Sequence, residues 1–529
     1  MSRKLTAVLA LSGLITAGAA GVEASAAETE LPVYGVKSAG LDDRQTAALQ
    51  RAFALKDVDR SEYGAVAFAD EDRYLHVPSV DRGEGKPGED GPTVQTAIDV
   101  DGLRRLKAIP AEEATKRVQE ALRGAGLLPS NATPTARNTT FELVDANGRA
   151  SLSAPLDTAV SYSFSLDGIP LEGAGAKLRV AYDGQGQVTG LSHSTRELSK
   201  TGSVPVYDLD RGRERCAKVF GDGVRPGKVS YVYVAPPLEE KVDRLLPSFR
   251  CEGVTADGSQ AQAITVPAAV GSTLPAPDPG QPPRDTSAKI SPLVESGEVG
   301  SEGTGNCSGL PNTSANIDSF NNEATGHGVP VQFSWKDANA WESDFKDPVF
   351  PGGDDSHYAD DVDLTYWQGH GSPTGFYFTG CSNHNDTKLA NTDARWGNLD
   401  VEWMSLFTCQ ILQDTSGGLT WAQRWAQAFR GLHQINSFTT VSYNSSNHGG
   451  KYAHYMLRSP FLWWNNPMKV RDAWAQASID TQPAAVIWAT MGPVSNGNLA
   501  NFNDYFHGKG AVSADVISSG VYWRISGAS

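Results

Sequence analysis

A proline-rich stretch divides the chain into two parts of different character. Between Val266 and Cys307, Gly, Ser and Glu are frequent and aromatic side chains are almost absent, and prolines recur at Pro267, Pro275, Pro277, Pro279, Pro282 and Pro283. Such a composition cannot bury enough apolar surface to order itself, so we predict a linker over residues 266–305. Because the 529 residues also exceed what one hydrophobic core usually organises, we expect separate domains at 27–265 and 306–529.

The first residues have the pattern of a secretory signal peptide. Arg3 and Lys4 precede an apolar stretch from Leu5 to Ala20, and the small residues Ala24-Ser25-Ala26 follow it. This pattern predicts a signal peptide over 1–26 and a secreted mature protein. A membrane anchor is not favoured, because the apolar stretch is shorter than the roughly 20 residues that a spanning helix needs.

The charge balance of the chain argues against two classes of partner. Acidic residues number 61 against 45 basic ones, the formal net charge is -16, and no block of Lys and Arg interrupts this balance. Nucleic acid and anionic membrane surfaces are therefore not expected as partners.

The first part of the chain has the pattern of helices packed on antiparallel strands. Residues 106–126 repeat apolar side chains at helical spacing, whereas Val160–Leu166 and Leu178–Tyr182 alternate apolar with polar or small residues. Asp183–Gly186 then turns the chain into Val188. These periods predict an α+β module.

The run Tyr162–Leu191, YSFSLDGIPLEGAGAKLRVAYDGQGQVTGL, resembles the PepSY-type and thermolysin-propeptide-like modules that precede many secreted peptidases. The similarity covers roughly residues 100–200. It implies that residues 27–265 are a propeptide-like region acting as an intramolecular chaperone or inhibitor. An unrelated small antiparallel sheet is the alternative, since alternation with glycine turns is common to many sheets.

After the linker, short apolar strands alternate with helices. Helical spacing occurs over 421–432, 449–460 and 468–480, and Phe438–Tyr443 and Ala484–Ala489 have the character of short buried strands. This alternation predicts an α/β domain with a mostly parallel sheet.

Two further strands of this domain end at residues whose side chains can take part in catalysis. Val362–Trp367 is followed by Gln368-Gly369-His370-Gly371, and Val401–Phe407 is followed by Thr408-Cys409. The carboxyl ends of parallel strands share one crevice, so the imidazole and the thiol can face each other there. A thiol attacks well only when a nearby imidazole handles its proton. The sequence therefore predicts Cys409 as nucleophile and His370 as general acid/base, with the amides of Gly371 and Cys409 as an oxyanion hole.

This arrangement resembles clan CD cysteine peptidases, the caspase, legumain and gingipain group. Their pattern is an apolar strand, His-Gly, a spacer, a second apolar strand, then a small residue and Cys, which His370, Gly371 and Cys409 match. Thr408 departs from the alanine that is usual before the Cys. The resemblance implies a caspase-like α/β sandwich. The runs DARWGNLDVEWMSLFTC and WAQRWAQAFRGLHQI are also similar to an uncharacterised family of secreted actinobacterial proteins, over about 306–529.

These observations predict a secreted cysteine peptidase or amidase, made as a zymogen and acting on a peptide or protein substrate. Two alternatives stay open at the candidate pair: Cys409 as a buried structural thiol or a half-cystine with Cys381, and His370 as a residue that stabilises its own loop. The alternative function is a non-enzymatic binding protein whose Trp-rich surface, including Trp463 and Trp464, recognises a cell-wall or polymeric ligand.

The five cysteines must leave one unpaired thiol within a single chain. Cys216 and Cys251 flank one apolar strand of the first part. Cys307 opens the second part, and Cys381 lies in a Gly- and Asn-rich loop that could reach it. We therefore predict disulfides Cys216–Cys251 and Cys307–Cys381 with Cys409 free, although spacing alone leaves other connectivities open.

No cofactor is predicted, and calcium is the only ion for which the sequence offers a candidate loop. The run Asp354–Asp361 carries four carboxylates around His357, which would suit calcium, but it lacks a complete loop motif and is favoured as a solvated acidic loop. The remaining candidates have no metal spacing with a partner carboxylate: His433, His448, His454 and His507. H-E-x-x-H, G-x-S-x-G and the P-loop are absent, which disfavours zincin, serine hydrolase and nucleotide hydrolysis chemistry.

Overall fold

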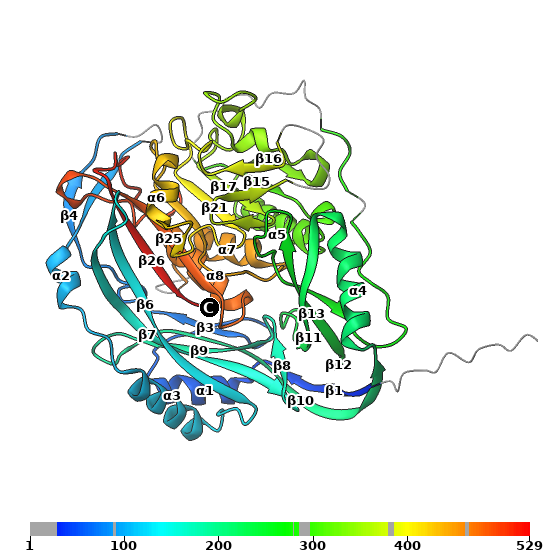
Figure 1. Cartoon of the computed structure of the whole chain (residues 1–529). Helices are drawn as coiled ribbons and strands as arrows, with labels where there is room; N and C mark the ends of the chain where they lie inside the picture. Colours follow the sequence, from blue (N-terminus) through cyan, green and yellow to red (C-terminus); the bar gives the residue numbers. More distant parts are fainter. Residues whose placement is uncertain (1–28, 88–90, 279, 285–296, 379–385, 461–464) are drawn as a thin grey trace, which may run out of the picture.

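The computed structural model describes residues 29–87, 91–278, 280–284, 297–378, 386–460 and 465–529 (Figure 1). The signal peptide predicted over 1–26 lies outside these residues. Within the described ranges, no helix has the length and apolar character that crossing a membrane would require.

A parallel sheet forms the centre of the C-terminal part. Its strands lie side by side in the order β16 (Val331–Lys336), β15 (Val299–Gly303), β17 (Leu364–Gln368), β21 (Trp403–Phe407) and β24 (Gln434–Phe438). The sheet continues antiparallel through β25 (Ile487–Val494) and β26 (Val521–Ala528). The helices α5 (Thr313–Gly326), α7 (His448–Leu457) and α8 (Val470–Thr481) are packed together beside this sheet. The predicted α/β domain with a mostly parallel sheet is observed in this coarse form.

The N-terminal part consists of long antiparallel strands with helices against one face. The strands β6 (Ala132–Asp145), β7 (Ala150–Leu166), β9 (Ala176–Tyr182) and β10 (Val188–Val206) pair in that order. On their outer side lie α1 (Asp43–Phe53) and α3 (Ala111–Ala125), as Figure 1 shows. The helix expected over 106–126 is thus α3, which begins only after Pro110.

Shorter elements complete this part. A second group of strands comprises β1 (Thr29–Ala39), β8 (Ile169–Glu172), β11 (Val224–Val234), β12 (Arg244–Leu245), β13 (Pro247–Thr255) and β14 (Ile264–Pro267), with α4 (Leu209–Phe220) against β11 and β13. The remaining elements are β2 (Asp59–Arg60), β3 (Val66–Ala69), β4 (Ser79–Glu84), β5 (Val94–Ile98) and α2 (Val100–Arg105).

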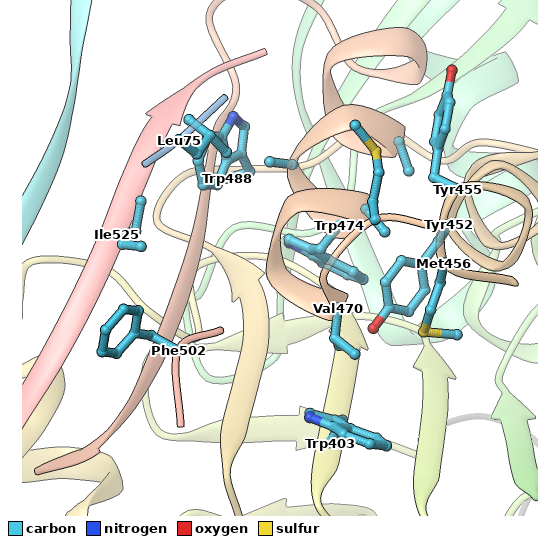
Figure 2. Packing of buried hydrophobic residues seen from close by; sticks show 14 of the residues in the cluster. Leu75, Trp403, Tyr452, Tyr455, Met456, Val470, Trp474, Trp488, Phe502 and Ile525 are labelled. Atoms are coloured by element: carbon cyan, nitrogen blue, oxygen red, sulfur yellow. The ribbon is translucent and has the colours of Figure 1, made fainter. Parts of the chain in front are cut away.

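The two parts share one continuous sheet. β26, near the C-terminus, pairs antiparallel with β6 from Val521 opposite Asp145 to Ser526 opposite Thr140. The apolar core also crosses the boundary, because Leu75 of the N-terminal part lies in the same cluster as Trp488 and Ile525 (Figure 2). The regions expected to be separate domains are therefore joined by backbone pairing and by packing.

The linker predicted over 266–305 is wrong at both ends, because the chain there forms β14 and β15. By composition, the glycines of β15 indicate a linker. Gly300 is instead required for packing in the sheet, because a Cβ there would lie 2.1 Å from the Phe333 ring. Before residues 285–296, which are not described, Arg284 is buried and forms a two-pronged ion pair with Asp344. Its guanidinium also stacks 4.2 Å from the Trp341 ring centre.

One predicted helix of the C-terminal part is much shorter than expected. The spacing over 421–432 predicts a helix, but α6 spans only Trp421–Trp425. The chain leaves the helix because the Ala428 carbonyl and the Arg430 amide bond to the backbone of Trp396 instead. The helices expected over 449–460 and 468–480 are confirmed as α7 and α8.

Most tryptophans of the described residues serve the core. Eight are almost completely buried: Trp367, Trp396, Trp403, Trp421, Trp425, Trp474, Trp488 and Trp523. Figure 2 shows Trp403 and Trp474 among the side chains packed between the helices and the sheet. A Trp-rich binding surface is therefore not observed there, and Trp463 and Trp464 lie outside the described residues.

Candidate active site

The structure brings the two predicted strand ends together. β17 and β21 are direct parallel neighbours, with Gln368 opposite Phe407, so His370 and Cys409 each stand two residues beyond a paired strand position. Gly371 packs against the residue before the cysteine, since a Cβ there would lie 2.2 Å from the Thr408 hydroxyl. The glycine is needed because the Thr408 side chain packs against its backbone, and not for unusual backbone angles.

His370 is completely buried and both of its ring nitrogens are engaged. The Gln262 backbone amide donates to Nδ1 at 3.1 Å, so Nδ1 carries the lone pair. The proton of the neutral ring is then on Nε2, which lies 2.8 Å from the Ser308 carbonyl oxygen. Burial lowers the pKa of His370 to about 4, against the opposing effect of the bond to Ser308.

Among the described cysteines Cys409 is the free thiol, as predicted, and it too is buried. Its sulfur lies 3.7 Å from the Ser442 hydroxyl and 3.9 Å from the Ser442 carbonyl oxygen. Burial raises the pKa of the thiol to about 12, although the contacts with Ser442 act in the opposite direction. No hydrogen bond joins the imidazole of His370 to this thiol. At neutral pH both groups are therefore uncharged, and each is engaged with other partners.

A loop from the N-terminal part closes the site. We call residues 256–263, between β13 and β14, the capping loop. Its Gln262 is fully buried, and besides bonding to His370 it donates from Nε2 to the Phe407 carbonyl and the Ser442 hydroxyl, both at 3.0 Å. One residue thus contacts His370 beyond β17 through its backbone amide and the end of β21 through its side chain.

The backbone of the capping loop continues this contact as a strand-like bridge. Ala263 donates to the Ser442 carbonyl at 3.1 Å and accepts from the Asn444 amide at 2.9 Å, in a parallel pairing with Tyr443. An extended segment of the N-terminal part therefore pairs alongside residues 442–444.

The outer side of the capping loop is fixed by polar contacts. Asp257 accepts hydrogen bonds from the Tyr377 and Thr255 hydroxyls and lies 3.5 Å from the Lys388 ammonium. Although burial acts to raise it, the pKa of Asp257 is lowered by these hydrogen bonds. Tyr377 and Lys388 belong to a small sheet of β18 (Gly371–Ser372), β19 (Gly375–Tyr377) and β20 (Lys388–Ala390), which begins directly after His370.

The turn after the thiol has an unusual backbone. Gln410 has a φ of 61°, a left-handed conformation that non-glycine residues adopt at a cost of roughly 1–2 kcal/mol. Its amide donates to the Thr440 carbonyl, which holds this turn in place. Strained backbone of this kind is common where a side chain must be presented to a reacting group. The oxyanion hole of the Gly371 and Cys409 amides stays a prediction.

The predicted cysteine pairing is confirmed for one bridge. Cys216 of α4 and Cys251 of β13 form a disulfide with their Cα atoms 5.8 Å apart. Cys307 is itself disulfide-bonded, but Cys381 lies outside the described residues, so the pairing of these two stays a prediction.

The acidic run Asp354–Asp361 is not simply a solvated loop. Asp355 and Asp360 are fully buried, and burial raises their pKa values to about 9 and about 8. Both carboxyl oxygens of Asp355 lack a hydrogen-bond partner, whereas His357 pairs with Asp354 at 2.5 Å. Calcium binding here stays a prediction.

Sequence reasoning missed one group that the fold assembles. Asp363, Glu402 and His507 come from distant parts of the chain, yet each offers a ligand atom within 4.8 Å of the other two. Spacing rules cannot find such a group. The available signal was that Asp363 and Glu402 each stand immediately before a buried strand, β17 and β21.

Comparisons with known proteins find one matching family model and distant structural similarities, none of which describes an activity. A family model described as a domain of unknown function (DUF6345) matches residues 300–527. No curated protein matched the chain. Among solved structures, an uncharacterised protein from Eubacterium rectale is 12% identical with a TM-score of 0.25, over 46% of this chain and 85% of that one. The Bacillus megaterium YpeB C-terminal domain is 10% identical with a TM-score of 0.20, over 44% of this chain and 95% of that one.

Proposed function

We propose that this chain is a secreted cysteine-dependent hydrolase of peptide or amide bonds, made as a latent precursor on a caspase-like α/β arrangement. One observation carries the proposal: adjacent parallel strands deliver His370 and Cys409 to one edge of the sheet, and the capping loop is inserted at that point. A thiol and an imidazole with only a packing role would not require the capping loop to bond to the residues at both strand ends.

Withdrawal of the capping loop would activate both groups. Water entering the site removes the burial that lowers the pKa of His370 and raises the pKa of Cys409, so both return toward ordinary values. Loss of the Gln262 amide also frees Nδ1, the ring nitrogen that carries the lone pair. Nδ1 is then the proton acceptor available to the thiol.

The reaction then follows from these two groups. Nδ1 of His370 takes the thiol proton, and the Cys409 sulfur attacks the substrate carbonyl carbon while the amides of Gly371 and Cys409 face the developing oxyanion. The C–N bond breaks as the imidazolium returns the proton to the leaving amine. Water finally hydrolyses the thioester and restores the thiol.

Latency also follows from the position of the loop. A cut between 268 and 297 falls after the capping loop, so cleavage alone leaves Gln262 in place. Activation therefore requires cleavage followed by displacement of the loop. A fragment meant to be active must begin before Val299, because β15 lies between β16 and β17.

The test compares hydrolysis of unstructured protein and peptide-library substrates by precursor and by cleaved chain. We expect activity only after cleavage and loop displacement, and Cys409→Ala should lower it at least about 1,000-fold, as loss of a nucleophile does elsewhere. Thr408→Ala is the matched control, since its buried hydroxyl has no hydrogen-bond partner and the clan CD pattern has alanine there. A Cys409→Ala protein as active as wild type would refute the mechanism.

A further inference from the structure

We propose a zinc site at the opposite edge of the same sheet, formed by Asp363, Glu402 and His507. This inference does not depend on the proposed hydrolase activity. Asp363 and Glu402 stand at the amino ends of β17 and β21, the strands whose carboxyl ends lead to His370 and Cys409. The backbone holds them together, because the Glu402 amide donates to the Asp363 carbonyl at 3.0 Å.

Three donor atoms converge in this group. His507 Nε2 lies 3.0 Å from Asp363 Oδ1 and 3.6 Å from Glu402 Oε2. Zinc bonds of about 2.1 Å in tetrahedral geometry place ligand atoms roughly 3.4 Å apart, between these two distances. The His507 ring also packs on Trp403, with ring centres 5.3 Å apart, which fixes its orientation.

The carboxyl oxygens on the inner side are the second observation. The side chain of Asp363 is 1% exposed, and its Oδ2 accepts from the amides of Gly297 at 3.0 Å and Glu298 at 2.6 Å. Its other oxygen, Oδ1, and Glu402 Oε2 both face His507 Nε2, and both form ion pairs with this one imidazole. A single imidazolium can balance only one of two carboxylates removed from water, whereas a divalent cation between the three donor atoms would balance both.

The donor set selects the ion. Calcium and magnesium prefer six or more oxygen ligands, whereas one imidazole with two carboxylates suits zinc, with an open fourth position for water. The nearby His433 is already bonded to Asp504 at 2.8 Å and to Asp515 at 3.3 Å. An ion here would tie the segment around His507 to the amino ends of β17 and β21, which is a structural role.

The test measures zinc binding to the full chain after chelator treatment, by calorimetry, and cobalt binding by its visible absorption. We expect one zinc ion per chain, a rise in the melting temperature on adding zinc, and at least about 100-fold weaker binding by Glu402→Gln. The matched control is Glu172→Gln, which alters a carboxylate whose side chain has the same 16% exposure but pairs with Arg250.

A second variant separates this site from the surface group Glu323, His327 and His454, whose side chains are 22–42% exposed. Binding that survives His454→Ala but is lost in Glu402→Gln supports the proposal. Zinc binding that is absent in wild type, unchanged in Glu402→Gln or abolished by His454→Ala overturns it. Selective binding of calcium through Glu402 with no zinc binding overturns it as well.

Discussion

Replacing Gln262 with alanine should open the candidate active site without unfolding the protein. The substitution removes the hydrogen bonds from Nε2 to the Phe407 carbonyl and to the Ser442 hydroxyl, both 3.0 Å long and fully buried. Each contributes about 0.5–1.5 kcal/mol, so the capped state should lose about 1–3 kcal/mol relative to the open one. The open fraction should rise roughly 5- to 150-fold.

Alkylation of Cys409 reports this opening without knowledge of the substrate. The thiol is fully buried, so its labelling rate in native protein follows the population of the open state. We expect labelling of Gln262→Ala to be faster by the same factor, with only a shallow dependence on urea. Gln260→Ala is the matched control, because Gln260 is exposed and makes one 3.4 Å contact with Gln410.

Three results would refute this reasoning. Labelling of Gln262→Ala within twofold of wild type would show that the side chain does not hold the loop. Equal acceleration by Gln260→Ala would show that the effect is not specific to the buried contacts. A urea dependence as steep as that of global unfolding would show that the thiol is reached only by unfolding the whole protein.

Two further predictions concern acid stability and the joined sheet. Burial lowers the pKa values of His193, His370 and His448 to about 4, about 4 and about 3. Between these values and the unfolded value of about 6.5, the unfolded chain takes up protons at these residues and the folded chain does not. The free energy of unfolding therefore falls as the pH falls through this range. His370→Gln should reduce that slope by about 1.4 kcal/mol per pH unit between about pH 6 and 4.5 in urea unfolding, and an unchanged slope would contradict the neutral imidazole. A chain cut between 268 and 297 should elute as one species in gel filtration, because β26 and β6 remain paired; separation of the fragments without denaturant would contradict this.

The ends of β17 and β21 could be predicted because the apolar runs in the sequence are the same residues that form the buried strands. Val362–Trp367 and Val401–Phe407 were expected as strands, and β17 and β21 occupy Leu364–Gln368 and Trp403–Phe407. Side-by-side placement of the two strands followed from the rules of parallel sheets. The sequence could not show that Gln262, more than 100 residues before His370, would fill the crevice between them.

Buried polar side chains explain why the strand next to β21 was predicted at the wrong residues. A strand was expected over Phe438–Tyr443, but β24 spans Gln434–Phe438 and includes polar residues that hydropathy assigns to the surface. Each finds a partner inside: Asn436 bonds to Ser405 and Thr490, and Ser437 to the Leu406 carbonyl. Tertiary partners of this kind are invisible to local patterns, and the same holds for the shared β26–β6 pairing.

If the site opens as proposed, we expect the capping loop to move rather than the whole N-terminal part. Its two stems are fixed, since β13 is bound to α4 through the Cys216–Cys251 disulfide and pairs with β14. The loop between them has only three alanines as apolar side chains and is held by hydrogen bonds. Its displacement therefore breaks polar contacts but exposes little apolar surface, and that cost can be offset by any partner that restores the bonds.

An extended peptide is such a partner. It can pair with Ser442 and Asn444 through the same backbone groups that Ala263 now occupies, and can replace the Gln262 bonds with its own amides. Substrate binding would then displace the capping loop directly, because both use the same hydrogen-bonding groups of residues 442–444. On this reasoning the leader inhibits by resembling the substrate backbone, so a soluble peptide spanning residues 258–265 should compete with substrate in the cleaved, opened protein.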